Sequence, residues 1–74
     1  MYYVYILKNI RDDFYIRYTN NMERRLMEHQ KQEDKTYKIV YYEAYAFEKD
    51  ARNRERRLKY YGSAWRALKK RFTA

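Results

Sequence analysis

The chain has 74 residues, with 18 Lys and Arg against 10 Asp and Glu for a net charge of +8, and it contains no Cys. This length allows one small domain spanning residues 1–74, and the lack of Cys excludes a disulfide framework and a Cys-based zinc site. No apolar run approaches the roughly 20 residues of a membrane span, and the first residues lack the features of a secretory signal. We therefore expect a cytoplasmic protein that has no membrane partner.

The first predicted elements are two strands joined by a turn. Residues 2–7 and 14–18 are rich in aromatic and β-branched residues, and the polar stretch between them predicts a turn near residues 9–12. Alternation along an antiparallel hairpin places Tyr5 and Tyr15 on the same face. The sequence therefore predicts two phenols that lie side by side.

A helix is expected next, over about residues 21–32. Asn20, followed three residues later by Glu23, resembles a capping box, and apolar residues then recur at helical spacing. Arg25 and His29 lie one turn apart on this helix. A third strand follows over Lys38–Tyr45, where simple alternation groups Ile39, Tyr41 and Glu43 on one face and Val40, Tyr42 and Ala44 on the other.

Two further helices complete the predicted order. Residues 49–61 contain no helix breaker and precede Gly62, the only glycine, which is well placed at a helix C′ position. Ser63 can cap a last helix whose apolar stripe contains Trp65, Leu68 and Phe72. The order is β-β-α-β-α-α, which is an α+β fold with a three-stranded sheet, antiparallel or mixed, flanked by helices.

One acidic residue interrupts an apolar stripe. Along the fourth predicted element the stripe runs from Ala51 through position 55 to Leu58, and position 55 is Glu. A carboxylate on an inward face costs several kcal/mol unless it is paired or bound to a cation, so about 2–5 kcal/mol of stabilisation has to be supplied. Two interpretations stay open: an ion pair of Glu55 with Arg25 or Arg54, and a divalent metal ion, since one carboxylate with waters and phosphate oxygens suits Mg²⁺.

The positive charge is concentrated at one end of the chain. Residues 1–48 hold 8 basic and 8 acidic side chains, whereas residues 49–74 hold 10 basic and 2 acidic. Like-charged pairs one helical turn apart are destabilising unless an anion offsets them. This pattern favours a polyanionic partner, although a solvated basic face kept for solubility is the alternative. The residues expected to contact nucleic acid are Arg17, Arg52, Arg56, Lys59, Arg66, Lys69 and Lys70.

In five ordered blocks the sequence resembles the GIY-YIG nuclease superfamily, and within it the small single-domain bacterial proteins related to the N-terminal nuclease domain of the excision-repair protein UvrC. The matching blocks are residues 3–9, 14–16, 18–26 with His29, 40–43 and 50–59. The resemblance implies a DNA endonuclease that uses one Mg²⁺ or Mn²⁺ ion and serves DNA repair or processing. A domain of this size could act as a homodimer or with an accessory protein.

The resemblance also implies roles for individual residues. Tyr5 is expected to position or deprotonate the attacking water, Tyr15 to contact the phosphate or the water, and Arg25 to stabilise the phosphate. His29 matches a histidine found in many members, and Glu55 matches the metal ligand. Together, such groups suit phosphodiester hydrolysis, in which a metal polarises the phosphate and a phenol or imidazole relays a proton.

One position departs from the superfamily pattern. Arg17 stands where the second motif ends in Gly, and alternation directs its side chain to the same face as Tyr15. Arg17 could crowd the phosphate or bind it as an additional cation. Two functions therefore stay open: a metal-dependent endonuclease, and a catalytically inactive nucleic-acid-binding module with the same fold, in which Arg17 blocks catalysis.

Overall fold

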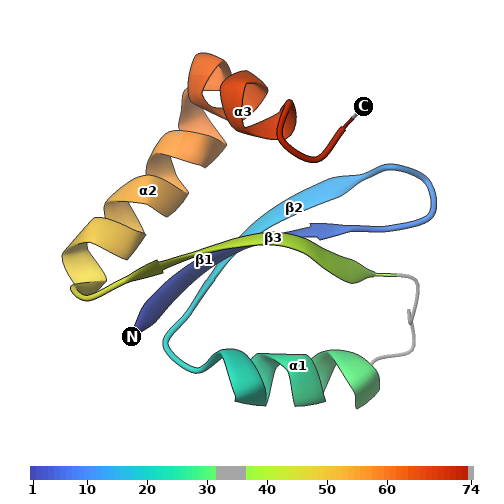
Figure 1. Cartoon of the computed structure of the whole chain (residues 1–74), viewed down its shortest axis with the longest axis vertical. Coiled ribbons are helices and arrows are strands. Elements are labelled where there is room, and N and C mark those ends of the chain that lie inside the picture. Colours follow the sequence, from blue (N-terminus) through green and yellow to red (C-terminus); the bar gives the residue numbers. More distant parts are fainter. Residues whose placement is uncertain (32–36, 74) are drawn as a thin grey trace.

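A computed structural model of the chain describes residues 1–31 and 37–73, except the side chains of residues 29–31. Its elements confirm the predicted α+β order. Helix α1 lies on one side of the sheet, and α2 and α3 lie on the other (Figure 1). The elements are β1 (Tyr2–Lys8), β2 (Phe14–Thr19), α1 (Met22–Lys31), β3 (Lys38–Tyr45), α2 (Glu48–Tyr60) and α3 (Gly62–Lys69).

The sheet has the strand order β2-β1-β3, with both neighbouring pairs antiparallel. The hairpin register pairs Tyr5 with Arg17 and Leu7 with Tyr15. Tyr5 and Tyr15 therefore share a face, as predicted, but they are diagonal neighbours two positions apart. Asn9 builds the turn, because its side-chain Oδ1 accepts hydrogen bonds from the backbone N–H groups of residues 11 and 13, each at 2.9 Å.

Strand β3 contains an irregularity that changes its alternation. Ile6 of β1 pairs with Tyr41, whereas Leu7 pairs with Ile39, so Val40 has no counterpart on β1. An extra residue of this kind is a β-bulge, and it shifts the phase of the side chains that precede it. Val40 and Tyr41 both pack against the apolar core. The predicted grouping of Ile39 with Tyr41, and of Val40 with Tyr42, is therefore wrong.

The apolar core lies between the sheet and helices α2 and α3. Its buried members are Val4 and Ile6 from β1, Ala51 and Leu58 from α2, and Leu68 from α3, each at most 3% exposed. Half-buried aromatic residues extend it: the Phe14 ring centroid lies 5.5 Å from that of Trp65 and 5.6 Å from that of Phe72. Rings at these distances supply the apolar mass that a chain poor in aliphatic residues would otherwise lack.

Helices α2 and α3 are joined by a single extended residue. Tyr61, with φ −115° and ψ 102°, donates its N–H to Arg57 O at 2.9 Å, and its carbonyl accepts the N–H of Ala64 at 3.1 Å. One residue thus ends α2 and begins α3. Gly62 directly follows Tyr61, the C-cap residue of α2, as predicted for a C′ position, but it has no positive φ and is also the first residue of α3. Ser63 is likewise inside the first turn and does not cap it.

Candidate active site

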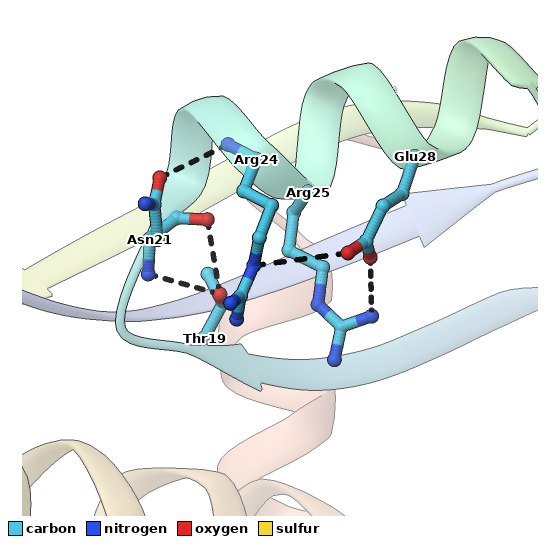
Figure 2. Close-up of polar contacts among 5 residues, drawn as sticks. All are labelled: Thr19, Asn21, Arg24, Arg25 and Glu28. Carbon is cyan, nitrogen blue, oxygen red and sulfur yellow. Dashed lines mark hydrogen bonds and ion pairs between the residues drawn. The ribbon is translucent and has the colours of Figure 1, made fainter.

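The start of α1 is fixed to the end of β2 by Thr19 and Asn21 (Figure 2). Asn21 Oδ1 accepts the backbone N–H of Arg24 at 3.0 Å, which makes Asn21 the N-cap residue, one position after the predicted Asn20. The Thr19 hydroxyl is buried. It accepts the N–H of Asn21 and donates to the Asn21 carbonyl, both at 3.1 Å. These bonds hold the first turn of α1 in a defined place.

Two arginines project from this turn. Arg25 Nη1 lies 3.0 Å from Glu28 Oε2, and Arg24 Nε lies 3.7 Å from Glu28 Oε1 (Figure 2). The Nε of Arg25 is buried and has no hydrogen-bond partner among the residues that the structure describes. A buried donor without a partner costs about 1–3 kcal/mol. The Arg25 side chain as a whole is 42% exposed, so the rest of its guanidinium remains open to an acceptor from outside the chain.

A cleft of about 470 Å³ lies between α1, β2 and the first half of α2. We call it the α1 cleft. It brings together four residues that the sequence singled out: Arg17, Arg25, Arg52 and Glu55. Its other charged lining residues, Arg24 and Glu48, were not predicted from the sequence. Four guanidinium groups around two carboxylates make the cleft attractive to an anion.

Glu55 is half-buried, with its side chain 17% exposed. Its Oε2 lies 3.0 Å from Lys59 Nζ, one turn further along α2. The predicted ion pair of Glu55 with Arg25 or Arg54 is therefore wrong. The reason is that an i,i+4 partner on the same helix is closer, while Arg25 pairs with Glu28 on its own helix.

Arg54, the neighbour of Glu55, is bonded to the sheet. Its Nε lies 3.0 Å from Glu43 Oε1 and its Nη2 lies 3.2 Å from Oε2, a two-pronged contact. The hydroxyls of Tyr41 and Tyr45 also donate to this carboxylate, at 2.6 and 2.5 Å. Burial alone would raise the pKa of Glu43, but these donors outweigh it and lower that pKa below its usual value. We call these four residues, Glu43, Arg54, Tyr41 and Tyr45, the Glu43 cluster. The Glu43 cluster links α2 to β3 and so holds α2 in the orientation in which Glu55 lines the α1 cleft.

Glu55 and Arg52 also line a second hollow, of about 550 Å³, on one side of α2. We call it the α2 hollow. Arg56 and Lys59, both predicted to bind nucleic acid, lie in it. The Arg52 guanidinium covers the Tyr18 ring, 3.9 Å from its centroid. The predicted residues Arg66, Lys69 and Lys70 belong to α3 or directly follow it and line neither hollow.

The Tyr5 side chain is buried on the α1 side of the sheet, 1% exposed. Burial raises the pKa of its phenol, and the positive charges of Arg25 and Arg17 oppose that shift. Tyr5 pairs with Arg17 across β1 and β2, and Arg17 lines the α1 cleft, so this phenol lies close to the cleft. With a raised pKa, the phenol stays protonated at neutral pH and can donate a hydrogen bond.

Tyr15 has other neighbours. Its ring centroid lies 5.1 Å from that of Tyr37, and a hydrogen bond with Tyr37 is the main cause of the raised pKa of Tyr15. The Arg17 guanidinium lies 5.3 Å from the Tyr15 ring centroid and donates Nη1 to the carbonyl of Ile16 at 3.0 Å. Sequence reasoning missed Tyr37, which no motif marks. The side chain of His29 lies outside the described residues.

Glu55 is also the candidate ligand for a divalent metal ion. The described residues contain no group of three or more His, Cys, Asp or Glu side chains that could hold a metal by themselves. Mg²⁺, however, is commonly held by one or two carboxylates, with waters and substrate phosphates as its remaining ligands. Lys59 contacts only one oxygen of Glu55. The donor set therefore fits an ion held by Glu55 together with substrate, and it does not fit a cage made of protein ligands alone.

Comparison with known proteins yields one family. The profile of the GIY-YIG catalytic domain matches residues 1–59, which include β1, β2, α1, β3 and most of α2. No curated protein and no solved structure matches the chain significantly. Among the described residues, none of the helices is both long and apolar enough to cross a membrane.

Proposed function

Because the chain belongs to the GIY-YIG nuclease superfamily, we propose that it is an endonuclease that hydrolyses DNA phosphodiester bonds with one bound Mg²⁺ or Mn²⁺ ion, in DNA repair or processing. Members of this superfamily are endonucleases that act on nucleic acid. The observation that carries the proposal is the α1 cleft, where Arg25 from α1 and Glu55 from α2 line the same cationic hollow close to the buried phenol of Tyr5.

Arg25 is the proposed phosphate ligand. Its Nη1 is held by Glu28, while its buried Nε has no acceptor among the described residues. The Arg25 side chain is 42% exposed and lines the α1 cleft, so a phosphate oxygen there would contact the exposed part of the guanidinium, which would stabilise the negative charge that develops on the phosphate during attack. Since the donor is already oriented, little reorganisation is needed when that charge appears.

Tyr5 is proposed to position the attacking water. Its phenol is protonated at neutral pH, since the ordinary pKa of tyrosine is about 10 and burial raises it further. A neutral phenol can both donate and accept a hydrogen bond, so it can orient a water molecule beside the phosphate that Arg25 holds. Tyr15 is proposed to contact the phosphate from β2, with His29 relaying a proton as the resemblance implies.

Glu55 is proposed to hold the metal ion. A bound divalent ion would supply Lewis-acid polarisation of the phosphate and a lower pKa for a coordinated water. Glu55 contributes the fixed carboxylate, and the Glu43 cluster keeps α2 in the orientation that presents it. Lys59 Nζ, at 3.0 Å, contacts one oxygen of this carboxylate, so a metal ion held there would have to share Glu55 with Lys59 or displace it.

The test compares Glu55→Gln with the wild type on supercoiled and branched DNA in Mg²⁺ or Mn²⁺. The substitution keeps the shape of the side chain and removes the metal ligand, so nicking should fall to background while salt-sensitive DNA binding persists. Glu23→Gln, an exposed residue of α1 with the same change in charge, is the control and should nick normally. Equal nicking by wild type and Glu55→Gln, or nicking in EDTA, would contradict the proposal.

The ion pair between Glu55 and Lys59 favours a second candidate, a nucleic-acid-binding module without activity. If Lys59 neutralises the carboxylate permanently, no metal binds there. Thermal unfolding with and without Mg²⁺ separates the two candidates, since a metal that binds only the folded chain raises its melting temperature. The inactive module predicts no nicking, no Mg²⁺-dependent stabilisation and unchanged salt-sensitive binding.

A further inference from the structure

We propose that the α2 hollow binds one flank of the nucleic-acid strand in single-stranded form, and that Tyr60 stacks on an unpaired base there. The inference rests on the proposed function only for the position of the scissile phosphate at Glu55. It concerns a segment beyond that phosphate, and Tyr60 lies just outside the residues 1–59 that the family profile matches. The ligand class is an unpaired nucleobase on a phosphate backbone.

The two hollows meet at the centre of the candidate site. Glu55 and Arg52 line both the α1 cleft and the α2 hollow. A strand whose scissile phosphate lies at Glu55 would therefore place one flank in the α1 cleft and the other in the α2 hollow. The second flank then runs along α2 toward Tyr60, the last residue of that helix.

The charges of the α2 hollow suit a phosphate backbone. Four cations from one side of α2 line it: Lys49, Arg52, Arg56 and Lys59. Because successive cations lie three or four residues apart, they follow the helix as a stripe rather than gathering at one point. The acidic residues in its lining are Asp50 and Glu55, and Glu55 is already paired with Lys59. A linear polyanion matches this arrangement better than a small compact anion does.

Tyr60 supplies the aromatic surface. Its side chain is 77% exposed although it belongs to a helix that packs against the core. Leu58, two residues earlier, is buried, and a difference of two residues turns a helical position by roughly 200° away from the buried face. Tyr60 therefore cannot reach the core. An exposed aromatic ring beside a row of cations is the combination that binds single-stranded nucleic acid, through stacking and phosphate contacts.

The next residue offers a matched control. Tyr61 is 60% exposed, has the same side chain and lies one peptide bond away. It lines a different hollow, of about 380 Å³, at the junction of α2 and α3 with Arg54 and Arg57. Any effect of tyrosine removal on general solubility or charge should be equal at both positions. A difference between them therefore reports on the α2 hollow.

The experiment measures binding in EDTA, where a metal-dependent nuclease cannot cleave. Fluorescence anisotropy with an oligodeoxythymidylate and with a duplex of the same length gives two affinities for wild type, Tyr60→Ala, Tyr60→Phe and Tyr61→Ala. Tyr60→Ala removes one stacking contact, so its affinity for the single strand should fall on the order of tenfold. Its affinity for the duplex should change by less than about twofold. Tyr60→Phe and Tyr61→Ala should bind as the wild type does. The salt dependence should be unchanged, because no phosphate contact is removed.

Three results would overturn the inference. The first is an equal loss of affinity for single strand and duplex, and the second is an equal loss with Tyr61→Ala. The third is a Tyr60→Ala protein that changes from dimer to monomer on size exclusion, which would make the ring a contact between copies of the chain. The proposed function fails separately: a wild-type protein that binds in EDTA and never nicks DNA in Mg²⁺ refutes the nuclease and leaves the stacking result intact.

Discussion

The two faces of the sheet differ in how completely they are covered (Figure 1). On the side of α2 and α3, buried residues such as Ile6 and Leu58 are at most 2% exposed. On the side of α1, Tyr5 is also buried, but Leu26 and Met27 of the helix remain 46% and 59% exposed, and charged groups line the α1 cleft. The larger apolar cluster therefore lies on one face, and the α1 cleft lies toward the other.

Helix α2 belongs to both regions. Leu58 anchors it in the core, and Glu55, three residues earlier, lines the α1 cleft. Residues one helical turn apart thus contribute to packing and to the candidate site, so a rotation of α2 about its axis would affect both. Arg54 and its bonds to Glu43 on β3 prevent such a rotation.

The largest expected effect breaks the core face. Ile6 is fully buried in the centre of the sheet, so Ile6→Ala should lower the free energy of unfolding by about 2–5 kcal/mol, through lost burial and the cavity left behind. Leu26→Ala on the exposed side of α1 should cost less than about 1 kcal/mol. Urea unfolding followed by circular dichroism measures both.

A domain of this size has a total stability of roughly 4–11 kcal/mol, so Ile6→Ala could leave too little folded protein to measure. Ile6→Val removes one methylene group and should cost about 0.5–1.5 kcal/mol. If Leu26→Ala were as destabilising as Ile6→Ala, the division of the molecule into a packed face and an open face would be wrong.

The next effect sharpens the comparison by removing the Glu43 cluster. Glu43→Gln removes the negative charge that faces Arg54. It also replaces one of the two oxygens that accept hydrogen bonds from Arg54, Tyr41 and Tyr45 with an NH₂ group, which is a donor. The expected loss is about 1–3 kcal/mol, below that of a fully buried pair because both side chains are partly exposed. Glu23→Gln, on the exposed face of α1, should cost less than about 1 kcal/mol. Thermal and urea unfolding at pH 7 measure both.

Acid should reproduce this substitution. The folded state lowers the pKa of Glu43 below its unfolded value, so the stabilisation is present above the unfolded pKa and is lost as the pH falls through the folded one. The wild type should therefore lose stability below about pH 4 more steeply than Glu43→Gln. At the other extreme, burial and the hydrogen bond to Glu43 raise the pKa of Tyr45 to about 12, so the stabilisation that comes from its neutral phenol is lost as the pH rises from the unfolded value toward 12. Equal acid slopes in the two proteins would show that the cluster does not stabilise the fold.

The element order could be predicted because each element carries a local signal. Alternation marked the hairpin, and a capping pattern marked the start of α1. The β-bulge at Val40 could not be predicted, because it depends on how β3 pairs with β1 and not on the residues of β3 alone. The geometry of the junction between α2 and α3 could not be predicted either. Tyr61, in an extended conformation, ends α2 without the left-handed glycine that commonly follows a helix.

The candidate site was predictable in part. Glu55 stood out because a carboxylate interrupts an apolar stripe, and the structure places it half-buried beside Arg25 and Arg17. Lys59 has i,i+4 spacing from Glu55, but the sequence does not show that Arg25 and Arg54 are already paired with Glu28 and Glu43, because those pairs depend on side-chain contacts in the folded chain. Arg24 could not be identified as a cleft residue from the sequence, although it is next to Arg25, because its place in the cleft depends on how α1 packs against β2 and α2.

The smallest expected effect concerns the place where the open face is fixed to the sheet. Asn21 Oδ1 accepts the N–H of Arg24, and the exposed Asn20 makes no comparable bond to the described residues. Asn21→Ala should therefore cost about 1 kcal/mol, and Asn20→Ala only a few tenths.

Because α1 contributes little to the core, the loss should appear mainly as faster hydrogen exchange in the first turn of α1, with β1 unchanged. Fraying of this turn would also make the position of Arg25 less defined. Asn21→Ala should therefore weaken DNA binding at low salt more than it lowers the free energy of global unfolding. If Asn20→Ala had the larger effect on exchange, the capping box suggested by the sequence would be the real start of α1, and Arg25 would be held by some other contact.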